Sequence, residues 1–322
     1  MVTSDGKNKE NIADRKRKLI GTTISINTIA ANEVLNRLET PVLLELHEKI
    51  SIPSLLNNAE AWDLSITDYK ELEQIELNSL KCLFNLPVRT PTPSVIFTLG
   101  TLYTSVRVHK KQLMYLHRIL NRETNHWTVK ILHSLETLNT GWYKAIKNIL
   151  NTYDLETEFG TIQNIPPPIW KTKVNEATEK RNKQKLIDSC YKKEGEIFVP
   201  KTKTLCLLKT LEKNEYVRKP MNEIRSLSKK DCKALIISRY GMLECGSNYK
   251  GTLREKCATC DVVDDEEHRL NHCITFRDSN FCDKDEKLPF KQIYSHDESV
   301  IRTMLSKIDR VWNVSTGQGA MR

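Results

Sequence analysis

The feature that most constrains this chain is a set of cysteines and a histidine in its C-terminal part, Cys257-x2-Cys260-x7-His268-x4-Cys273. Two thiols two residues apart can reach one ion from a tight turn. A His/Cys pair about one helical turn apart can complete the tetrahedral shell that Zn²⁺ prefers. These four side chains leave no position open for water or substrate, which a catalytic zinc requires. The spacing therefore predicts a structural zinc site.

The identity of the fourth ligand depends on where a local helix ends. His272 would share a helical face with His268, whereas Cys273 can bind only if the helix stops there. Thiolate chemistry favours Cys273, with His272 as the alternative. The loop between the two pairs is shorter than the roughly twelve residues of a finger that places a helix in the major groove, so we expect a compact knuckle. The competing interpretation is a buried turn with ordinary reduced thiols.

Composition indicates a folded, soluble, intracellular protein, nuclear or cytoplasmic. A chain of 322 residues with 39% hydrophobic residues is long enough for two domains and a sizeable core. Nine cysteines in a Lys-rich chain whose N-terminus lacks an apolar leader argue against a disulfide framework. No apolar run approaches the roughly eighteen residues that cross a bilayer, so we expect no membrane partner.

The net charge of +9 is concentrated in one block. Residues 171–239 carry 19 Lys and Arg against 9 Asp and Glu, a balance of +10, so the rest of the chain is neutral within one charge. A concentrated cationic segment attracts polyanions and releases their counterions, which predicts RNA, DNA or a hybrid of the two as the partner. A solvated helical surface without a ligand is the alternative.

Candidate phosphate contacts are cationic side chains of this block and of the predicted helices before it. They are Arg15, Lys16, Arg17, Lys18, Arg107, Lys110, Lys111, Lys180, Arg181, Lys183, Lys185, Lys192, Lys193, Arg218, Lys219, Lys229 and Lys230. Catalytic signatures such as a Gly-rich phosphate loop, GxSxG or HExxH do not occur, so we assign no catalytic residue.

Hydrophobic periodicity is helical almost throughout, which predicts a mainly all-α fold. Ser65 and Asp68 form a capping box at the start of one helix, Pro53 should kink or divide the helix before it, and Gly100 can end a short helix. The predicted helices cover residues 9–30, 40–62, 65–86, 105–121, two stretches within 127–153, 229–238 and 298–312, with an extended stretch at 197–208.

Ile165-Pro166-Pro167-Pro168 is the best candidate for a linker, because consecutive prolines are stiff and cannot continue a helix. We therefore predict a domain boundary there. The expected segments are a basic N-terminal helix at 1–39, a helical bundle at 40–164, a basic helical region at 165–240, the knuckle at 241–282, and a C-terminal helix and tail at 283–322.

The order of these motifs resembles the region after the catalytic palm in non-LTR retrotransposon reverse transcriptases. Three stretches match the family's thumb pattern of a kinked helix ending in NAE-x-W, a second helix, and LP-x-x-TP-x-P. They are Ile52-Pro53-Ser54-Leu55-Leu56-Asn57-Asn58-Ala59-Glu60-Ala61-Trp62, Leu72-Glu73-Gln74-Ile75-Glu76 and Leu86-Pro87-Val88-Arg89-Thr90-Pro91-Thr92-Pro93. The knuckle spacing with Glu266-Glu267-His268 is similar to the family's cysteine-rich motif, so the resemblance covers about residues 9–280.

This resemblance implies that residues 1–39 connect palm to thumb, and that the thumb lies along the minor groove of a template–primer duplex. The parent polypeptide would be an RNA-directed DNA polymerase with its palm upstream. Polymerase chemistry needs palm aspartates that hold two Mg²⁺ ions, whereas the Asp-Asp pair of this sequence, Asp264-Asp265, lies between the zinc ligands. We therefore expect a non-catalytic C-terminal fragment that binds nucleic acid. The alternative is a helical protein-interaction scaffold with a structural zinc site.

Overall fold

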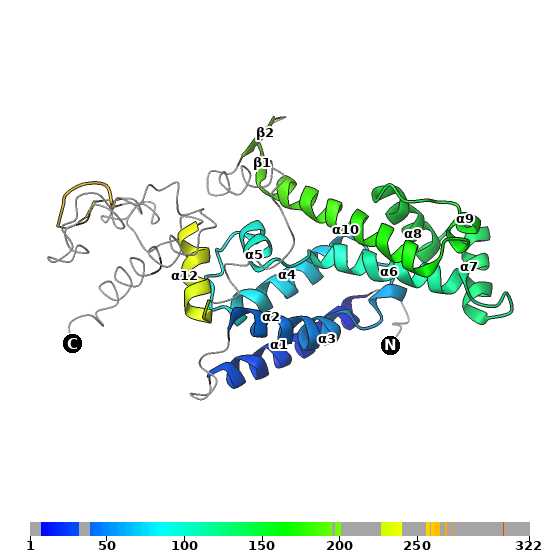
Figure 1. Ribbon diagram of the computed structural model, residues 1–322, viewed down its shortest axis with the longest axis horizontal. Helices are drawn as coiled ribbons and strands as arrows, with labels where there is room; N and C mark the ends of the chain where they lie inside the picture. Colours follow the sequence, from blue (N-terminus) through cyan, green and yellow to red (C-terminus); the bar gives the residue numbers. More distant parts are fainter. Residues whose placement is uncertain are drawn as a thin grey trace.

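The computed structural model describes residues 8–31, 39–194, 197–200 and 227–239, together with 256, 257, 259–264, 268, 273 and 305. This part of the chain is mainly helical, which confirms the predicted fold class (Figure 1). The elements are α1 (Lys9–Ala31), α2 (Thr40–Leu46), the π-helix η1 (His47–Ser51), α3 (Ile52–Leu56), the 3₁₀ turn η2 (Ala59–Ala61), α4 (Ile66–Leu83), α5 (Thr92–Leu99), α6 (Thr104–Leu120), α7 (Trp127–Leu138), α8 (Gly141–Thr152), α9 (Phe159–Gln163), α10 (Pro167–Ser189), β1 (Tyr191–Glu194), β2 (Ile197–Pro200) and α12 (Lys229–Arg239).

Local sequence signals set several of these boundaries. At the start of α4 the Asp68 N–H donates to Ser65 Oγ (3.1 Å) and the Ser65 N–H donates to Asp68 Oδ2 (2.9 Å), which is the predicted capping box. Gly100 ends α5 with φ of 62°, a left-handed conformation that costs glycine little. The first four residues of the extended stretch predicted at 197–208 form β2, which pairs antiparallel with β1, and residues 201–208 lie outside the described residues. The predicted helix at 298–312 lies outside the described residues apart from Leu305.

Pro53 does not divide its helical segment, which instead changes its hydrogen-bonding pattern just before the proline. The chain turns without interruption from α2 through the π-helix η1 into α3, and Pro53 occupies the first turn of α3. Proline lacks the N–H that an α-helix needs and its ring crowds the preceding turn, so a wider π turn just before it relieves the clash. The segment therefore continues past the proline instead of breaking.

Three hydrophobic clusters form the interior of the described helices. One joins α1 to α3 and α4 through residues such as Ile12, Leu19 and Leu72, all fully buried. A second gathers α2, α4, α5 and α12, and a third gathers α6, α7, α8 and α9. Within this part of the chain, no helix has the length and apolar composition that crossing a bilayer demands.

The structure differs from the expected domain boundary at Ile165-Pro166-Pro167-Pro168. Pro167 is the first residue of α10, a position where proline suits a helix because its missing N–H would have no partner anyway. Figure 1 shows α10 lying along α6, and its side chains belong to two clusters, Trp170 to the third and Leu186 to the second. The prolines therefore mark the start of a helix that packs within the second and third clusters.

Residues 227–239 join the same body. The Thr40 N–H and Thr40 Oγ1 both donate to the Leu227 carbonyl oxygen, at 3.0 and 2.9 Å, so the chain before α12 is tied to the start of α2. Leu235 and Ile236 of α12 are fully buried in the second cluster. Residues of the predicted bundle at 40–164 thus share hydrophobic clusters with α10 and α12 of the predicted basic region at 165–240.

Replacing Trp170 tests whether α10 is integral to this core. The Trp170 side chain is 0% exposed, donates from Nε1 to the Leu113 carbonyl oxygen (3.1 Å) and stacks on His117. We expect Trp170→Ala to lower the free energy of unfolding in urea by about 3–5 kcal/mol. The neighbouring Ile169→Ala, at a side chain 51% exposed, should change it by less than about 0.5 kcal/mol. Equal, small effects of both substitutions would mean that α10 is only loosely attached.

Candidate functional site

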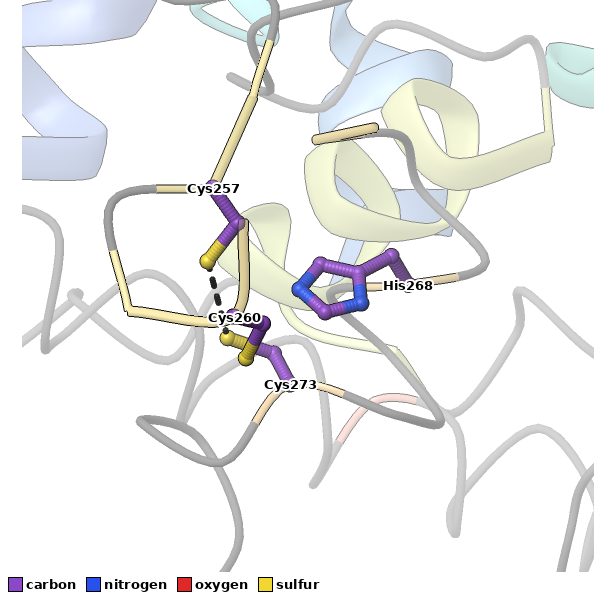
Figure 2. A group of neighbouring side chains, drawn as sticks. All are labelled: Cys257, Cys260, His268 and Cys273. Carbon is purple, nitrogen blue, oxygen red and sulfur yellow. Dashed lines mark hydrogen bonds between the residues drawn. The ribbon is translucent and has the colours of Figure 1, made fainter. Parts of the chain in front are cut away.

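Cys257, Cys260, His268 and Cys273 point toward one another (Figure 2) and could together hold a metal ion. One ligand atom from each side chain lies within 4.8 Å of all the others. The sulfurs of Cys257 and Cys273 are 3.6 Å apart. A tetrahedral shell with metal–sulfur distances of about 2.3 Å separates its sulfurs by about 3.8 Å. The spacing thus suits a shared ion, and it is far longer than the roughly 2.05 Å of a disulfide bond.

A tight backbone turn brings the first two thiols together. The Asp261 N–H donates to the Cys257 carbonyl oxygen (2.9 Å) and the Cys257 N–H to the Val262 carbonyl oxygen (2.8 Å). Lys256 and Val263 form an antiparallel bridge that closes this loop. Asp261 has φ of 52°, a left-handed conformation that aspartate tolerates better than most residues. The turn places the Cys257 and Cys260 side chains beside each other.

The second pair is held by a separate backbone contact. The Cys273 N–H donates to the His268 carbonyl oxygen at 2.7 Å, which brings the two side chains close despite the four residues between them. Both are buried, whereas Cys257 and Cys260 are half-buried. Cys273 therefore takes part in the cluster as predicted, and the alternative ligand His272 lies outside the described residues.

Hydrogen bonding favours the metal-binding form of Cys257. Burial raises the pKa of its thiol, but hydrogen bonds from His268 and from the backbone N–H groups of Thr259 and Cys260 outweigh that effect and lower the pKa to about 6. The thiolate is the form of cysteine that ligates metals. Near neutral pH the cluster thus presents a charged sulfur to an ion.

Arg107 requires a correction, because it is not a phosphate contact. Its side chain is 9% exposed and its guanidinium pairs with Glu48 through two hydrogen bonds and with Glu76, whose Oε1 lies 3.3 Å from Arg107 Nε. Burial raises the pKa of Glu76, while the Arg107 charge and a hydrogen bond from Thr104 act in the opposite direction. The guanidinium therefore neutralises the buried Glu76 and the half-buried Glu48.

His47 lies in the same buried network. Its side chain is fully buried on η1, and Nε2 is 4.0 Å from Glu76 Oε1. Burial, assisted by the nearby charge of Arg107, lowers the pKa of His47 to about 4. The imidazole is therefore neutral at physiological pH, and Arg107 supplies the positive charge between the two carboxylates.

Lys185 and Lys229, two further predicted phosphate contacts, are also engaged within the protein. Lys185 Nζ pairs with the Glu73 carboxylate and donates to Ser105 Oγ (2.7 Å). Lys229 Nζ donates to Asn27 Oδ1 (3.0 Å), and burial lowers its pKa. Both amines link separate helices and both side chains are half-buried, and their role as phosphate contacts stays a prediction.

Most of the other predicted cations lie at or near the surface. Those described as exposed are Lys16, Arg17, Lys18, Lys180, Arg181 and Lys230. The half-buried ones are Arg15, whose guanidinium lies 6.0 Å from the centre of the Trp62 ring, Lys110, Lys111 and Lys183. Lys192 and Lys193 are described only as backbone of β1, and Arg218 and Lys219 lie outside the described residues.

Sequence reasoning missed Glu60 and Arg118, which line a groove beside α6. Arg107, Lys111, Met114 and Arg118 recur at intervals of three and four residues, which places them along one face of a helix. That spacing could have indicated a mixed cationic and apolar face. Nothing in the sequence, however, shows that Glu60 of η2 lies opposite it.

No family model, curated protein or solved structure matches this chain. The resemblance to reverse transcriptases therefore stays an expectation from the sequence motifs.

Removing Arg107 should show how much the stability of the fold depends on its pairing with the buried carboxylate of Glu76. We expect Arg107→Met to lower the free energy of unfolding by about 3–5 kcal/mol, because Glu76 would keep its burial and lose its cation. The control Arg118→Met, at an exposed position on the same helix, should have an effect below about 1 kcal/mol. Adding Glu76→Gln to Arg107→Met should recover part of the loss in a double-mutant cycle. Additive effects would contradict the direct pairing.

Proposed function

We propose that this chain is a non-catalytic nucleic-acid-binding part of a polypeptide of the non-LTR retrotransposon reverse transcriptase type, with a structural zinc ion in its C-terminal region. The Cys257, Cys260, His268 and Cys273 cluster is the single observation that carries this proposal. A knuckle of this ligand order is what the sequence resemblance implies downstream of a thumb. The upstream partner would be a palm domain that performs the polymerisation.

Zinc is the ion that the donor set favours. Three sulfurs and one imidazole nitrogen suit Zn²⁺, whereas Mg²⁺ and Ca²⁺ prefer oxygen ligands. Four protein ligands fill a tetrahedral shell and leave no open position, which is typical of structural sites. When bound, the ion would cross-link the Cys257/Cys260 turn to the His268/Cys273 pair and stabilise the fold around them.

Exposed positive charge supports nucleic acid as the partner. Lys16, Arg17 and Lys18 are consecutive exposed cations on α1, and Asp14 forms ion pairs with Arg17 and Lys18. Lys180 and Arg181 are exposed on α10. Clusters of this kind bind the phosphate backbone largely without sequence preference and release its counterions. The ligand would be RNA, DNA or an RNA–DNA hybrid.

One observation favours the alternative, a helical protein-interaction scaffold. Trp127, Ile131 and Leu138 form a stripe along one face of α7, and each side chain is about half exposed or more. Exposed apolar stripes of this kind often mark protein-binding surfaces. A folded chain that retains no nucleic acid at moderate salt would select this alternative.

Metal analysis tests the zinc site. We expect the purified chain to contain about one zinc ion per molecule, measured by inductively coupled plasma mass spectrometry. Cys257→Ser should lose most of this zinc, because one of the four ligands is removed. Cys82→Ser is the matched control, since Cys82 is an exposed free thiol outside the cluster and should keep full zinc content. Metal-free wild-type protein that is indifferent to chelators would refute the site.

Salt dependence tests the nucleic-acid partner. We expect the affinity for an RNA–DNA hybrid, measured by fluorescence polarisation, to fall linearly with salt on a logarithmic plot. Replacing Lys16, Arg17 and Lys18 by Gln should reduce that slope by up to about 3, since each lost phosphate contact removes about 0.9. The control replaces Lys70, Lys130 and Lys144, three exposed cations outside the predicted set, and should leave the slope nearly unchanged. A flat slope for the wild-type chain would count against electrostatic binding.

A further inference from the structure

A groove of about 380 Å³ lies beside α6, bounded on its other side by α3 and η2. Its apolar lining includes Ile52 and Leu56 of α3, both buried, and Met114 of α6, which is half-buried. The volume falls at the lower end of the roughly 300–1,000 Å³ typical of small-molecule sites. The groove thus suits a ligand about the size of one nucleotide.

Positive charge dominates the polar lining of this groove. Lys110, Lys111 and Arg118 project from the same part of α6, and Lys111 Nζ is anchored by donating to the Leu56 carbonyl oxygen (3.0 Å). Arg107 also lines the groove, but Glu48 and Glu76 neutralise it. With Lys110, Lys111 and Arg118 beside it and Glu60 opposite, the groove has more cationic than acidic lining residues, which favours an anionic ligand.

Glu60 is the acidic residue of the lining. The η2 turn that carries it is held in place, because Trp142 Nε1 donates to the Glu60 carbonyl oxygen (3.0 Å). Within the described residues, the Glu60 carboxylate oxygen Oε2 is shielded from solvent and accepts no hydrogen bond. Because Glu60 lines the groove, its carboxylate can accept a hydrogen bond from an N–H or O–H group of a bound ligand.

We propose that this groove binds one unpaired nucleotide of a nucleic-acid strand. Lys110 and Arg118 receive its phosphate, a sugar hydroxyl or base amine donates to Glu60, and the remainder packs on Leu56 and Met114. Inorganic phosphate would leave the apolar lining and Glu60 unused, and a fatty acid would bring no donor for Glu60. A base-paired nucleotide is stacked and paired inside its duplex, so its base cannot enter the groove unless it is first unpaired. This inference rests on the proposed nucleic-acid binding and assigns it a site and a ligand class.

The decisive test is Glu60→Met, which removes the acceptor and one negative charge together. If the groove were only an electrostatic trap, losing a carboxylate would tighten the binding of an anion. If Glu60 accepts a hydrogen bond from the ligand, affinity for a single-stranded oligonucleotide should fall about tenfold. Fluorescence polarisation on the full chain measures this, and circular dichroism with a thermal melt verifies that the variant is folded. Glu60→Gln keeps one acceptor oxygen, so it should remain within about threefold of wild type.

The cations are tested with a charge-matched control. Lys110→Met with Arg118→Met should weaken single-strand binding by about tenfold or more. Lys171→Met with Lys173→Met removes two exposed cations of α10 outside the groove and should have an effect below about threefold. A nucleoside monophosphate should compete for the groove better than inorganic phosphate, and a duplex of the same sequence should compete more weakly than the single strand.

Each outcome separates this inference from the proposed function. Wild-type protein that binds the strand while Glu60→Met binds it equally or more tightly would overturn the groove assignment and leave nucleic-acid binding intact. Equal competition by duplex and single strand would overturn the preference for an unpaired nucleotide. A wild-type chain that binds the monophosphate and no oligonucleotide would support the groove and overturn the proposed function. Failure of the wild-type chain to bind either would overturn both.

Discussion

The pairing of Arg107 with Glu48 and Glu76 is the interaction on which the arrangement of the described helices most depends. It joins α6 to the half-buried Glu48 of η1 and to the buried Glu76 of α4, and a buried guanidinium or carboxylate without its partner would be strongly unfavourable. Hydrophobic contacts tolerate small rotations of a helix, whereas this bidentate pair with Glu48 requires a defined one. The rotation it sets decides which face of α6 carries the groove.

The rotation of α6 about its axis also determines which of its side chains line the groove and which pack on α10. With Arg107 directed inward, Lys110, Lys111 and Arg118 follow on the part of α6 that faces α3 and η2. The opposite side of α6 meets α10, whose Trp170 donates to the Leu113 carbonyl oxygen. One buried ion pair thus gives α6 both a cationic surface and a packed one.

How far the sequence predicts this structure differs between local and long-range features. The capping box at Ser65, the helix end at Gly100 and the Cys257, Cys260, His268 and Cys273 set are local or nearly local patterns, and the structure bears out the first two and brings the four side chains together. Pro167 was misleading, because proline is equally compatible with a linker and with the first turn of a helix. Whether Pro167 starts a helix or belongs to a linker depends on the burial of Trp170, and the run of prolines does not show that burial.

Arg107 illustrates why long-range contacts could not be predicted from the sequence. An arginine that binds phosphate and a buried arginine that neutralises glutamates are the same residue type on the same kind of helix. The difference lies in Glu48 and Glu76, which come from separate elements and approach only after the chain has folded. For the same reason Glu60 could not be placed opposite α6 from its position in the sequence.

The length of α10 has a mechanical consequence. Its 23 residues rise about 1.5 Å each, so the helix extends about 34 Å and contributes side chains to two of the three clusters. A hinge between those clusters would have to break consecutive backbone hydrogen bonds in the middle of a helix that contains no glycine. The helix is therefore rigid, and the second and third clusters that it connects should move as one unit.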